Sequence, residues 1–391
     1  MYNYIPLEQA ADILDSYRKP VNSKERLNLN KGKPLDELFP YYGATGQVGW
    51  IDSFLTDGEY ILLGEDGAPF LNPYAEKAYI IHGKTWVNNH AHILRSKTNN
   101  EFLCYYLNYF NYKKYVSGTT RLKLTQAQMR KIPIPNIPSD EQSRIVARIE
   151  ELFSKLDKAV DTLKTTKEQL EVYRQAVLKD AFQEKENIIR LGDAIEKPRY
   201  GTSKKCDYPC TANSTAVLRI PNIDTKNGRV DSSDLKYAEF NEKELEQLSL
   251  KNGDILIIRS NGSISLVGSS AIIRKCDTDK TYAGYLMRLR ILNKEKLLPK
   301  YLLYYLSSPD ARRYIESVAK STSGVNNINS QEISKLCVPL SSIEKQEKTV
   351  AEIEMKLSVY HEIEKSVDTV LVQADAMRQS ILKQAFEEGI V

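Results

Sequence analysis

Two stretches of the chain, QSRIVARIEELFSKLDKAVDTLKTTKEQLEVYRQAVLKDAF at residues 142–182 and QEKTVAEIEMKLSVYHEIEKSVDTVLVQADAMRQSILKQAF at residues 346–386, align without a gap at a constant offset of 204 residues. Both begin with glutamine, and both end in Leu-Lys, one further residue and Ala-Phe. Apolar or neutral residues recur along each stretch in alternating steps of four and three, which is the spacing of a coiled-coil seam. The sequence therefore predicts two long helices that arose by duplication.

The predicted seam occupies equivalent positions in the two helices. They are Ile145, Ile149, Leu152, Leu156, Ala159, Leu163, Thr166, Leu170, Tyr173 and Val177 in the first helix, and Thr349, Ile353, Lys356, Tyr360, Ile363, Val367, Val370, Ala374, Met377 and Ile381 in the second. Further apolar residues of the first helix lie outside this seam, at Val146, Phe153, Val160 and Leu178. They predict that the helix also buries surface against something other than its twin.

The duplication extends through the rest of the chain. Leu7 to Ala10 resembles Leu191 to Ala194, and Ile132-Pro-Ile-Pro135 resembles Leu336-Cys-Val-Pro339 just before each helix. A repeat of about 200 residues is too long for a solenoid, whose periods run about 20–50 residues. The chain therefore divides into four predicted parts: a globular domain at 1–138, a helix at 139–186, a second globular domain at 187–340 and a second helix at 341–391.

We expect an α+β fold in which two similar α/β domains are separated by two long antiparallel coiled-coil helices, with pseudo-twofold symmetry. Two similar domains joined through the first helix, with the second helix trailing, are nearly symmetric only if the helices lie antiparallel. About forty residues of helix make a rod of roughly 60 Å. Candidate strands, such as Asp254–Ile258 and Leu286–Leu292, lie between polar loops.

The composition indicates a soluble, cytoplasmic protein. No apolar stretch approaches the roughly 20 residues of a membrane span, and the first residues show no signal pattern. An odd count of five scattered cysteines favours a reducing compartment. Cys206 and Cys210 have no second ligand pair at zinc spacing, and His82, His90 and His92 fit ordinary hydrogen-bonded histidines better than ligands. We therefore expect no metal site.

The charge is unevenly distributed among the four parts. In chain order, the net charges are +3, −2, +7 and −4. The globular domains are thus basic and the helices acidic. This asymmetry suits a protein whose domains bind a polyanion while its helices serve protein partners.

Motifs for catalysis are missing from the sequence. There is no Gly-x-x-x-x-Gly-Lys phosphate loop, and the glycines of the segment 43–49 have the wrong spacing for a dinucleotide fingerprint. Leu71-Asn-Pro-Tyr74 resembles the Asn-Pro-Pro-Tyr box of amino methyltransferases but lacks its second proline. No Ser/His/Asp or Cys/His arrangement stands out. We therefore expect no catalytic residue and no cofactor site in this chain.

Polar loops rich in Arg, Lys, Asn, Ser and Gly are the candidate DNA-binding sites. Arg can fork onto guanine and Asn onto adenine, while Ser, Thr and Lys hold phosphates. Ordinary turns have the same composition, but such loops occur in both halves of the chain. The candidate residues are Tyr42, Gly43, Thr45, Lys84, Asn88, Asn89, His90, Arg121 and Lys123 in the first domain, and Arg199, Tyr200, Thr202, Ser203, Lys204, Arg219, Asn222, Arg259, Asn261, Ser263, Asn326 and Asn327 in the second.

Several motifs together resemble the specificity (S, or HsdS) subunits of Type I restriction-modification systems. The segment 124–135, the pair Glu141-Gln142 and the Ala-Phe end of the first helix carry the resemblance, and a degenerate copy follows at 328–339, at Gln346 and at 380–386. It covers essentially the whole chain. The second copy departs from the pattern in having Lys345 before its glutamine and Lys356 in its seam, so we expect that helix to pack less tightly near its start.

The resemblance implies that each globular domain is a target-recognition domain that reads one half of a bipartite site in double-stranded DNA. The helices would set the spacer and dock two methyltransferase (M) subunits, with restriction (R) subunits completing the complex. The M subunits would use S-adenosylmethionine to methylate flipped adenine bases, and the R subunits would use ATP and Mg. This chain would itself be non-catalytic and would act in the cytoplasm of a prokaryotic cell.

Two other classes of protein remain as alternatives. A self-contained DNA methyltransferase would need a glycine-rich cofactor loop and an Asn/Asp-Pro-Pro-Tyr/Phe box, and methyl transfer by the purified chain alone would favour it. A structural coiled-coil adaptor would leave the basic loops unexplained, and the absence of a salt-sensitive interaction with DNA would favour it.

Overall fold

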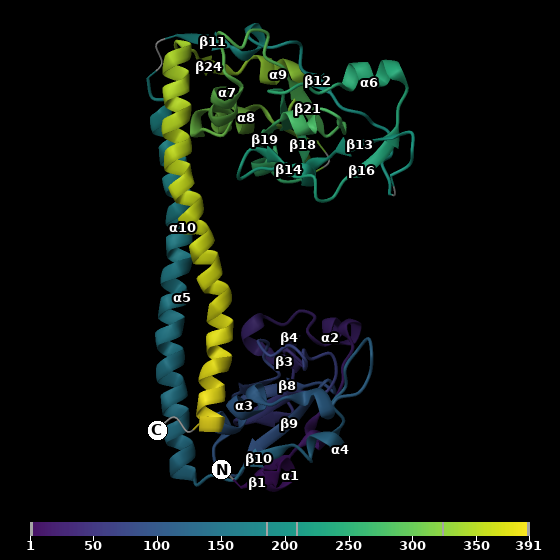
Figure 1. Ribbon diagram of the computed structural model, residues 1–391. Helices are drawn as coiled ribbons and strands as arrows, with labels where there is room; N and C mark the ends of the chain where they lie inside the picture. The colour runs from purple at the N-terminus through teal and green to yellow at the C-terminus, as the bar shows by residue number, and fades with distance from the viewer. Residues whose placement is uncertain (1–2, 185–186, 209, 323, 389–391) are drawn as a thin grey trace. The chain divides into compact units, whose positions relative to one another are not determined.

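The computed structural model describes residues 3–184, 187–208, 210–322 and 324–388. The chain forms two compact units, unit 1 with residues 1–165 and 367–391, and unit 2 with residues 166–366. Each unit combines one globular domain with one end of each long helix, α5 (Ser139–Ala181) and α10 (Ile343–Lys383) (Figure 1). In the described part of the chain, no helix is both long and apolar enough to span a membrane.

The globular domain of unit 1, called domain 1 below, contains two four-stranded sheets. One is antiparallel in the order β2-β9-β6-β7, and the other has the order β4-β3-β8-β5 with β3 and β8 parallel. The strands of the first sheet are β2 (Ala11–Ile13), β9 (Ala91–Ser96), β6 (Tyr60–Gly64) and β7 (Ala78–Ile81). Those of the second are β4 (Gly46–Ile51), β3 (Phe39–Gly43), β8 (Lys84–Val87) and β5 (Thr56–Asp57).

Helices of domain 1 begin at capping side chains. The Asn99 side chain accepts a hydrogen bond from the backbone N–H of Phe102 at the start of α3 (Asn100–Tyr109), and Thr125 caps α4 (Gln126–Met129) in the same way. The other short helices are α1 (Leu7–Ala10) and α2 (Ser23–Leu29). Because α3 buries its apolar face against the first sheet, it forms the centre of the domain core.

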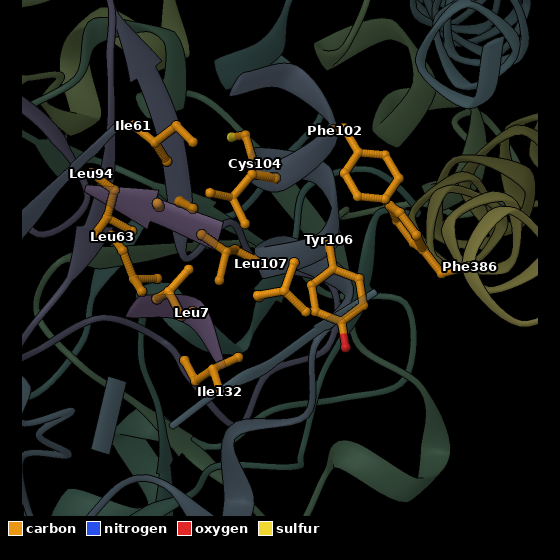
Figure 2. Close-up of a cluster of buried hydrophobic side chains, with 14 of the residues drawn as sticks. Leu7, Ile61, Leu63, Leu94, Phe102, Cys104, Tyr106, Leu107, Ile132 and Phe386 are labelled. Atoms are coloured by element: carbon orange, nitrogen blue, oxygen red, sulfur yellow. The ribbon is translucent and has the colours of Figure 1, made fainter. Parts of the chain in front are cut away.

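Both long helices contribute to the core of unit 1. Ile145 and Ile149 of α5 and Leu382 of α10 are buried in the same cluster as α3 and the first sheet. Phe386, in the π-helical turn that follows α10 (Gln384–Glu388), packs edge-on against Phe102 and Tyr106 (Figure 2). The end of α10 is therefore a structural part of domain 1.

The globular domain of unit 2, called domain 2 below, contains a six-stranded sheet and two three-stranded sheets. The six-stranded sheet consists, in spatial order, of β12 (Arg199–Tyr200), β21 (Leu286–Leu289), β17 (Ile255–Ile258), β19 (Ser270–Ile272), β15 (Arg229–Val230) and β14 (Ile223–Asp224). The smaller sheets are β16 (Lys236–Glu239), β13 (Ser214–Leu218) and β20 (Thr281–Tyr282), and β18 (Ser260–Asn261), β23 (Val325–Asn327) and β22 (Lys320–Thr322). Strands β17 and β21 confirm the two strands predicted from the sequence, with β21 ending earlier.

The helices of domain 2 are α6 (Glu242–Leu248), α7 (Pro299–Leu306), α8 (Pro309–Val318) and α9 (Ser330–Ser334). Phe182 from the end of α5 packs edge-on against Tyr301 and Tyr305 of α7, at ring-centroid distances of 5.1 and 5.2 Å. Ile353 and Leu357 of α10 are buried in the same core. Since Phe182 and Phe386 are separated by the repeat offset, the two units build equivalent cores from equivalent residues.

The first and last strands of each domain pair with each other. β1 (Tyr4–Pro6) is antiparallel to β10 (Pro133–Pro135), and β11 (Ile188–Arg190) is antiparallel to β24 (Cys337–Pro339). β10 and β24 are the Pro-containing segments that precede the long helices. Each domain is therefore closed at the point where the chain passes into a helix.

The two long helices run antiparallel, as predicted, because unit 1 joins the beginning of α5 to the end of α10 and unit 2 joins the end of α5 to the beginning of α10. Most of the predicted seam is confirmed. The buried or partly buried positions are Ile145, Ile149, Leu152, Leu156, Leu163, Thr166, Leu170 and Val177 of α5, and Thr349, Ile353, Tyr360, Val367, Ala374 and Ile381 of α10.

Six predicted seam positions are wrong by one residue. Ala159 and Tyr173 of α5 are exposed, as are Lys356, Ile363, Val370 and Met377 of α10. The positions one residue later are covered instead: Val160 and Arg174 in α5, and Leu357, Glu364, Leu371 and Arg378 in α10. Several of these residues are charged, and their apolar stems are buried while their charged ends find partners.

The apolar residues outside the predicted seam are covered by the chain itself. Val146 belongs to the core of domain 1 and Leu178 to the core of domain 2. Phe153 packs edge-on against Tyr105 at 5.7 Å. The burial of Val146, Phe153 and Leu178 is therefore explained by domains 1 and 2 and needs no external partner.

Candidate nucleic-acid interface

The candidate residues of domain 1 gather around the loop 64–67, which follows the central strand β6. Glu65 donates its backbone N–H to the carbonyl of His90 at 2.7 Å, and its own carbonyl accepts from the N–H of Leu124 at 2.7 Å. Asp66 forms a β-bridge with Lys123. Gly67 has a φ of +74°, a left-handed conformation that favours glycine. The loop therefore joins the segment that contains Asn88, Asn89 and His90 to the segment that contains Arg121 and Lys123.

Two carboxylates hold the basic side chains of this cluster. Asp66 Oδ1 lies 2.7 Å from His90 Nδ1 and 2.7 Å from Arg121 Nη2. Glu65 is paired with Lys123 at 3.1 Å on one side and with Arg18 at 2.5 Å on the other. Burial alone would raise the pKa of the Glu65 carboxyl, but hydrogen bonds from Arg18 and Lys123 lower that pKa below its usual value. The cluster presents cations at its surface above a negatively charged base.

A buried contact between His92 and Asp15 lies beneath the loop. The fully buried His92 ring is 2.7 Å from Asp15 Oδ2 through Nδ1 and 3.0 Å from the Leu124 carbonyl through Nε2. Asp15 also accepts the backbone N–H of Ile93 at 3.0 Å. Burial opposes ionisation of Asp15, but the hydrogen bond and charge of His92 keep its pKa below the usual value. These contacts fix the Leu124 backbone against the sheet.

Tyr42, Gly43 and Asn88 position this surface from within the domain. The Gly43 carbonyl accepts the Tyr79 hydroxyl at 2.5 Å, and Asn88 donates its backbone N–H to the Tyr42 carbonyl at 3.1 Å. The buried Asn88 side chain accepts the N–H of His90 at 2.8 Å. The exposed candidates of this edge are Thr45, at the tip of the β3–β4 hairpin, and Asn89.

Lys84 lies apart from the other candidates of domain 1. It begins β8, whereas Asn88 follows the end of that strand. Its ammonium nitrogen lies 4.9 Å from the centre of the exposed Phe54 ring, a cation–π contact. The structure therefore does not bring Lys84 into the cluster around the loop 64–67.

In domain 2, the equivalent loop follows the central strand β17 and begins with Arg259. The Arg259 guanidinium donates to the Gly284 carbonyl at 3.1 Å and to Asn327 Oδ1 at 3.0 Å, and it lies 4.5 Å above the centre of the Tyr200 ring. The Tyr200 hydroxyl accepts the backbone N–H of Ser330 at 2.8 Å. One side chain thus connects four loops of the domain.

Asn261 and Asn326 face each other in the pairing of β18 with β23. Asn261 Oδ1 accepts the backbone N–H of Ser263 at 2.8 Å, and Asn326 Nδ2 donates to the Gly262 carbonyl at 2.9 Å. Ser263 is exposed, and its hydroxyl lies 2.8 Å from that of Ser265. Residue 323 of the same polar segment lies outside the described residues.

Thr202 and Ser203 belong to a segment that approaches the β20–β21 turn closely. A Cβ atom at Gly201 would lie 2.2 Å from the Tyr282 carbonyl oxygen, so only glycine fits there. Thr202 accepts the N–H of Gly284 at 2.7 Å. In the same turn, Tyr285 is 61% exposed. The sequence analysis missed Tyr285, although a glycine between tyrosines just before a strand is a sign of a close turn.

The remaining candidates of domain 2 are engaged within the domain. Arg219 pairs with Asp234 at 2.9 Å, and the buried Asn222 side chain donates to the Asp234 carbonyl at 2.8 Å. Arg199 donates to the Gln247 carbonyl, and Lys204 pairs with Glu244 at 2.7 Å. Asn222 therefore shapes a turn, whereas Ser203 and Lys204 are exposed.

The two clusters are built in the same way. In each domain, the loop after the central strand is bound to the segment just before a capped short helix, α4 after Thr125 in domain 1 and α9 after Asn329 in domain 2. Thr125 and Asn329 are separated by the repeat offset. Exposed cations, amides and hydroxyls on such loops suit recognition of phosphates and base edges. Among the described residues, no group of three His, Cys, Asp or Glu could hold a metal ion.

Known proteins resemble this chain in sequence. Residues 8–172 match the model of the Type I restriction modification DNA specificity domain. A Haemophilus influenzae protein assigned as a type I restriction enzyme specificity subunit is 29% identical over 316 residues, which is 77% of this chain and 74% of that protein. The EcoKI specificity subunit of Escherichia coli K12 is 28% identical over 285 residues, which is 69% of this chain and 60% of the relative.

Solved structures share the fold. A chain from a type I R-M system, studied for its complex assembly and conformational transition, matches with a TM-score of 0.70 at 16% identity and covers 100% of this chain and 98% of its own length. The HsdS subunit from Thermoanaerobacter tengcongensis gives a TM-score of 0.53 at 16% identity, covering 100% of this chain and 97% of that subunit. Residues 8–172 therefore match a Type I restriction-modification DNA specificity domain, and the chain is similar over most of its length to the specificity (S) subunits of these systems, as its duplicated helix indicated.

Proposed function

We propose that domain 1 and domain 2 each read one half of a bipartite target in double-stranded DNA. The observation that carries this proposal is the pair of equivalent loop clusters, one following β6 and the other following β17. Both present side chains that bind phosphates or base edges, and the two clusters differ in sequence, as two different half-sites require. Arg121 and Lys123 of domain 1 suit phosphates, whereas the amides of Asn261 and Asn326 in domain 2 suit base edges.

The long helices set the distance between the two half-sites. α5 is a continuous helix of 43 residues with one end in each unit. At about 1.5 Å per residue it is roughly 65 Å long, comparable to about 19 base pairs at about 3.4 Å each. Because each domain shares its core with the helix ends, a change in helix length changes the separation of the domains without changing either reading surface.

The helices also dock two methyltransferase subunits. Apart from its buried seam, α10 carries an exposed apolar stripe of Met355, Val359, Ile363, Val370 and Met377. At about 100° per residue these side chains fall within an arc of roughly 80°. A contiguous exposed apolar stripe on a helix is suited to packing against helices of another protein. The acidic charge of the helices directs DNA to the domains and leaves this stripe to the partner.

The chemistry belongs to the partner subunits. The methyltransferase subunits supply S-adenosylmethionine and methylate adenine bases that have been flipped out of the duplex. The restriction subunits supply ATP-driven translocation and cleavage. In this assembly the chain is the non-catalytic subunit that selects the target.

Co-expression with its methyltransferase subunits tests this function. Mapping of methylated adenines in the host genome should give a bipartite target with a fixed spacer, and binding of the complex to DNA should weaken steeply with salt. Methyl transfer by the purified chain alone would instead support a self-contained methyltransferase. A complex without salt-sensitive DNA binding would support a coiled-coil adaptor.

A further inference from the structure

The amides of Asn261 and Asn326 each have one polar group in use and one group available. Among the described residues, no acceptor takes a hydrogen bond from Asn261 Nδ2, and no donor reaches Asn326 Oδ1, while the opposite ends of the two amides are held by Ser263 and Gly262. Directly opposed residues of an antiparallel pair place their side chains on the same face. The loop therefore offers a donor and an acceptor side by side.

This pattern matches one base in the major groove. Adenine presents the N7 acceptor beside the N6 amino donor, whereas guanine presents two acceptors, cytosine a donor, and thymine an acceptor next to a methyl group. Both asparagine side chains are partly exposed, so a base edge can approach them. If domain 2 reads one half-site, as proposed above, a donor and an acceptor held in this way select adenine.

Arg259 is tied too firmly to read a base itself. Its guanidinium already donates to a backbone carbonyl and to an amide oxygen, and its flat face lies on the Tyr200 ring. Through Asn327, the neighbour of Asn326 in β23, it fixes the strand that pairs with Asn261. A planar guanidinium can make these contacts together, whereas an ammonium group cannot.

We propose that Asn261 and Asn326 together read an adenine in the half-site of domain 2, and that Arg259 is the positioning residue that sets their geometry. The proposal deepens the DNA-reading function stated above and rests on it. It also changes the role predicted for Arg259 from the sequence, which was direct contact with DNA.

The test uses the full chain in complex with its methyltransferase subunits and maps methylated sites across a genome. In Asn261→Asp the donor becomes an acceptor, so the complex should lose its preference for adenine at one position of one half-site. Cytosine, which offers the N4 donor, should be accepted more often at that position. One lost bidentate pair corresponds to a change of about 5- to 150-fold in discrimination. Asn293→Asp is the matched control, because Asn293 makes the same local bond to the N–H of Glu295 at 2.8 Å elsewhere in domain 2.

Arg259→Lys separates positioning from direct contact. It should relax discrimination at the same base position as Asn261→Asp, while discrimination at the half-site of domain 1 stays unchanged. Relaxation at a guanine position would show that Arg259 reads a base itself, and would overturn its role as a positioning residue. A lowered unfolding midpoint with every position equally relaxed would overturn it as well.

The failure of the inference differs from the failure of the proposed function. An unchanged target for Asn261→Asp, in a complex that still methylates a bipartite site, would overturn the reading of adenine by this pair and leave the function standing. If the unmodified complex methylates no bipartite site, both are overturned.

Discussion

Replacing Phe386 with alanine should destabilise unit 1 and leave unit 2 intact. Phe386 is 2% exposed, and its ring lies 5.5 Å from Phe102, 5.2 Å from Tyr106 and 5.6 Å from Tyr109 between ring centres. Loss of a buried phenylalanine costs about 3–5 kcal/mol. Because three aromatic partners lose their neighbour, we expect a loss at the upper end of that range, about 4–5 kcal/mol.

Native-state hydrogen exchange measures this loss separately in each unit. The amides of α3 should exchange faster by a factor that corresponds to the lost free energy, while those of α7 keep their protection. The matched variant is Phe182→Ala, whose ring packs on Tyr301 and Tyr305 of α7 in the same way. It should produce the opposite pattern.

Two results would refute this reasoning. Equal loss of protection in α3 and α7 for either variant would mean that the two units do not open separately. A loss below about 1 kcal/mol for Phe386→Ala would mean that its ring is not part of the domain 1 core, since buried phenylalanines cost several times more.

Three further predictions concern charge, length and docking. Burial lowers the pKa of Lys77 from 10.5 to about 8, so the unfolded chain binds this proton more tightly. Lys77→Met should therefore raise the unfolding free energy by about 3 kcal/mol below pH 8, and the gain should disappear as the pH rises through 10.5. An unchanged difference at pH 11 would contradict this. Insertion of seven residues after Thr165 in α5 and seven after Ser366 in α10 should lengthen the spacer of the methylated target by about three base pairs, with both half-sites unchanged. A variant that methylates the original spacing would show that the helices do not set the spacer. Val359→Glu should weaken co-purification with the methyltransferase subunits at least tenfold. Val372→Glu is the control, because Val372 is 74% exposed and lies on another face of α10, and it should leave co-purification unchanged. Equal effects of the two variants would show that the exposed apolar stripe of α10 is not the docking face.

The seam shows how far sequence periodicity can predict a coiled coil. The residues shared by both possible registers, such as Ile149 and Ile353, are apolar and were assigned correctly. Six of the alternate positions were shifted by one because the covered residues there include Arg174, Glu364 and Arg378, which a search for apolar residues rejects. Their partners come from elsewhere in the fold.

These charged seam residues are satisfied locally in each unit. Arg378 pairs with Asp157 of α5 and lies over the Phe153 ring. Glu364 pairs with Lys226, from the β14–β15 turn of domain 2, at 2.8 Å. A contact between residues 138 positions apart cannot be inferred from helical spacing, so the correct register was beyond the sequence pattern.

The candidate interface was partly predictable from the composition of its loops. Gly, Asn and Arg marked the loops, and the structure brings Asn88 to His90, Arg121 and Lys123 together in one domain and Tyr200, Arg259, Asn261 and Asn327 in the other. The sequence could not show which side chains are used internally. Asn222 and Asn88 have the composition of contact residues but fill buried hydrogen-bonding positions, and Asp66, which holds His90 and Arg121, was overlooked.

The sharing of the domain 1 core with the far end of the chain sets an order for synthesis. Tyr109 bonds to Glu387, which is 278 residues away, so domain 1 leaves the ribosome first yet waits for its last helix. About 250 residues separate the end of domain 1 at residue 138 from Glu387. At about 5–20 residues per second this is an interval on the order of 10–50 s. The core of domain 2 is complete once Leu357 has been made, close behind its own final strand. The half that is made first therefore closes last, and its uncovered aromatic surface is what a chaperone or an aggregating neighbour would meet on the nascent chain.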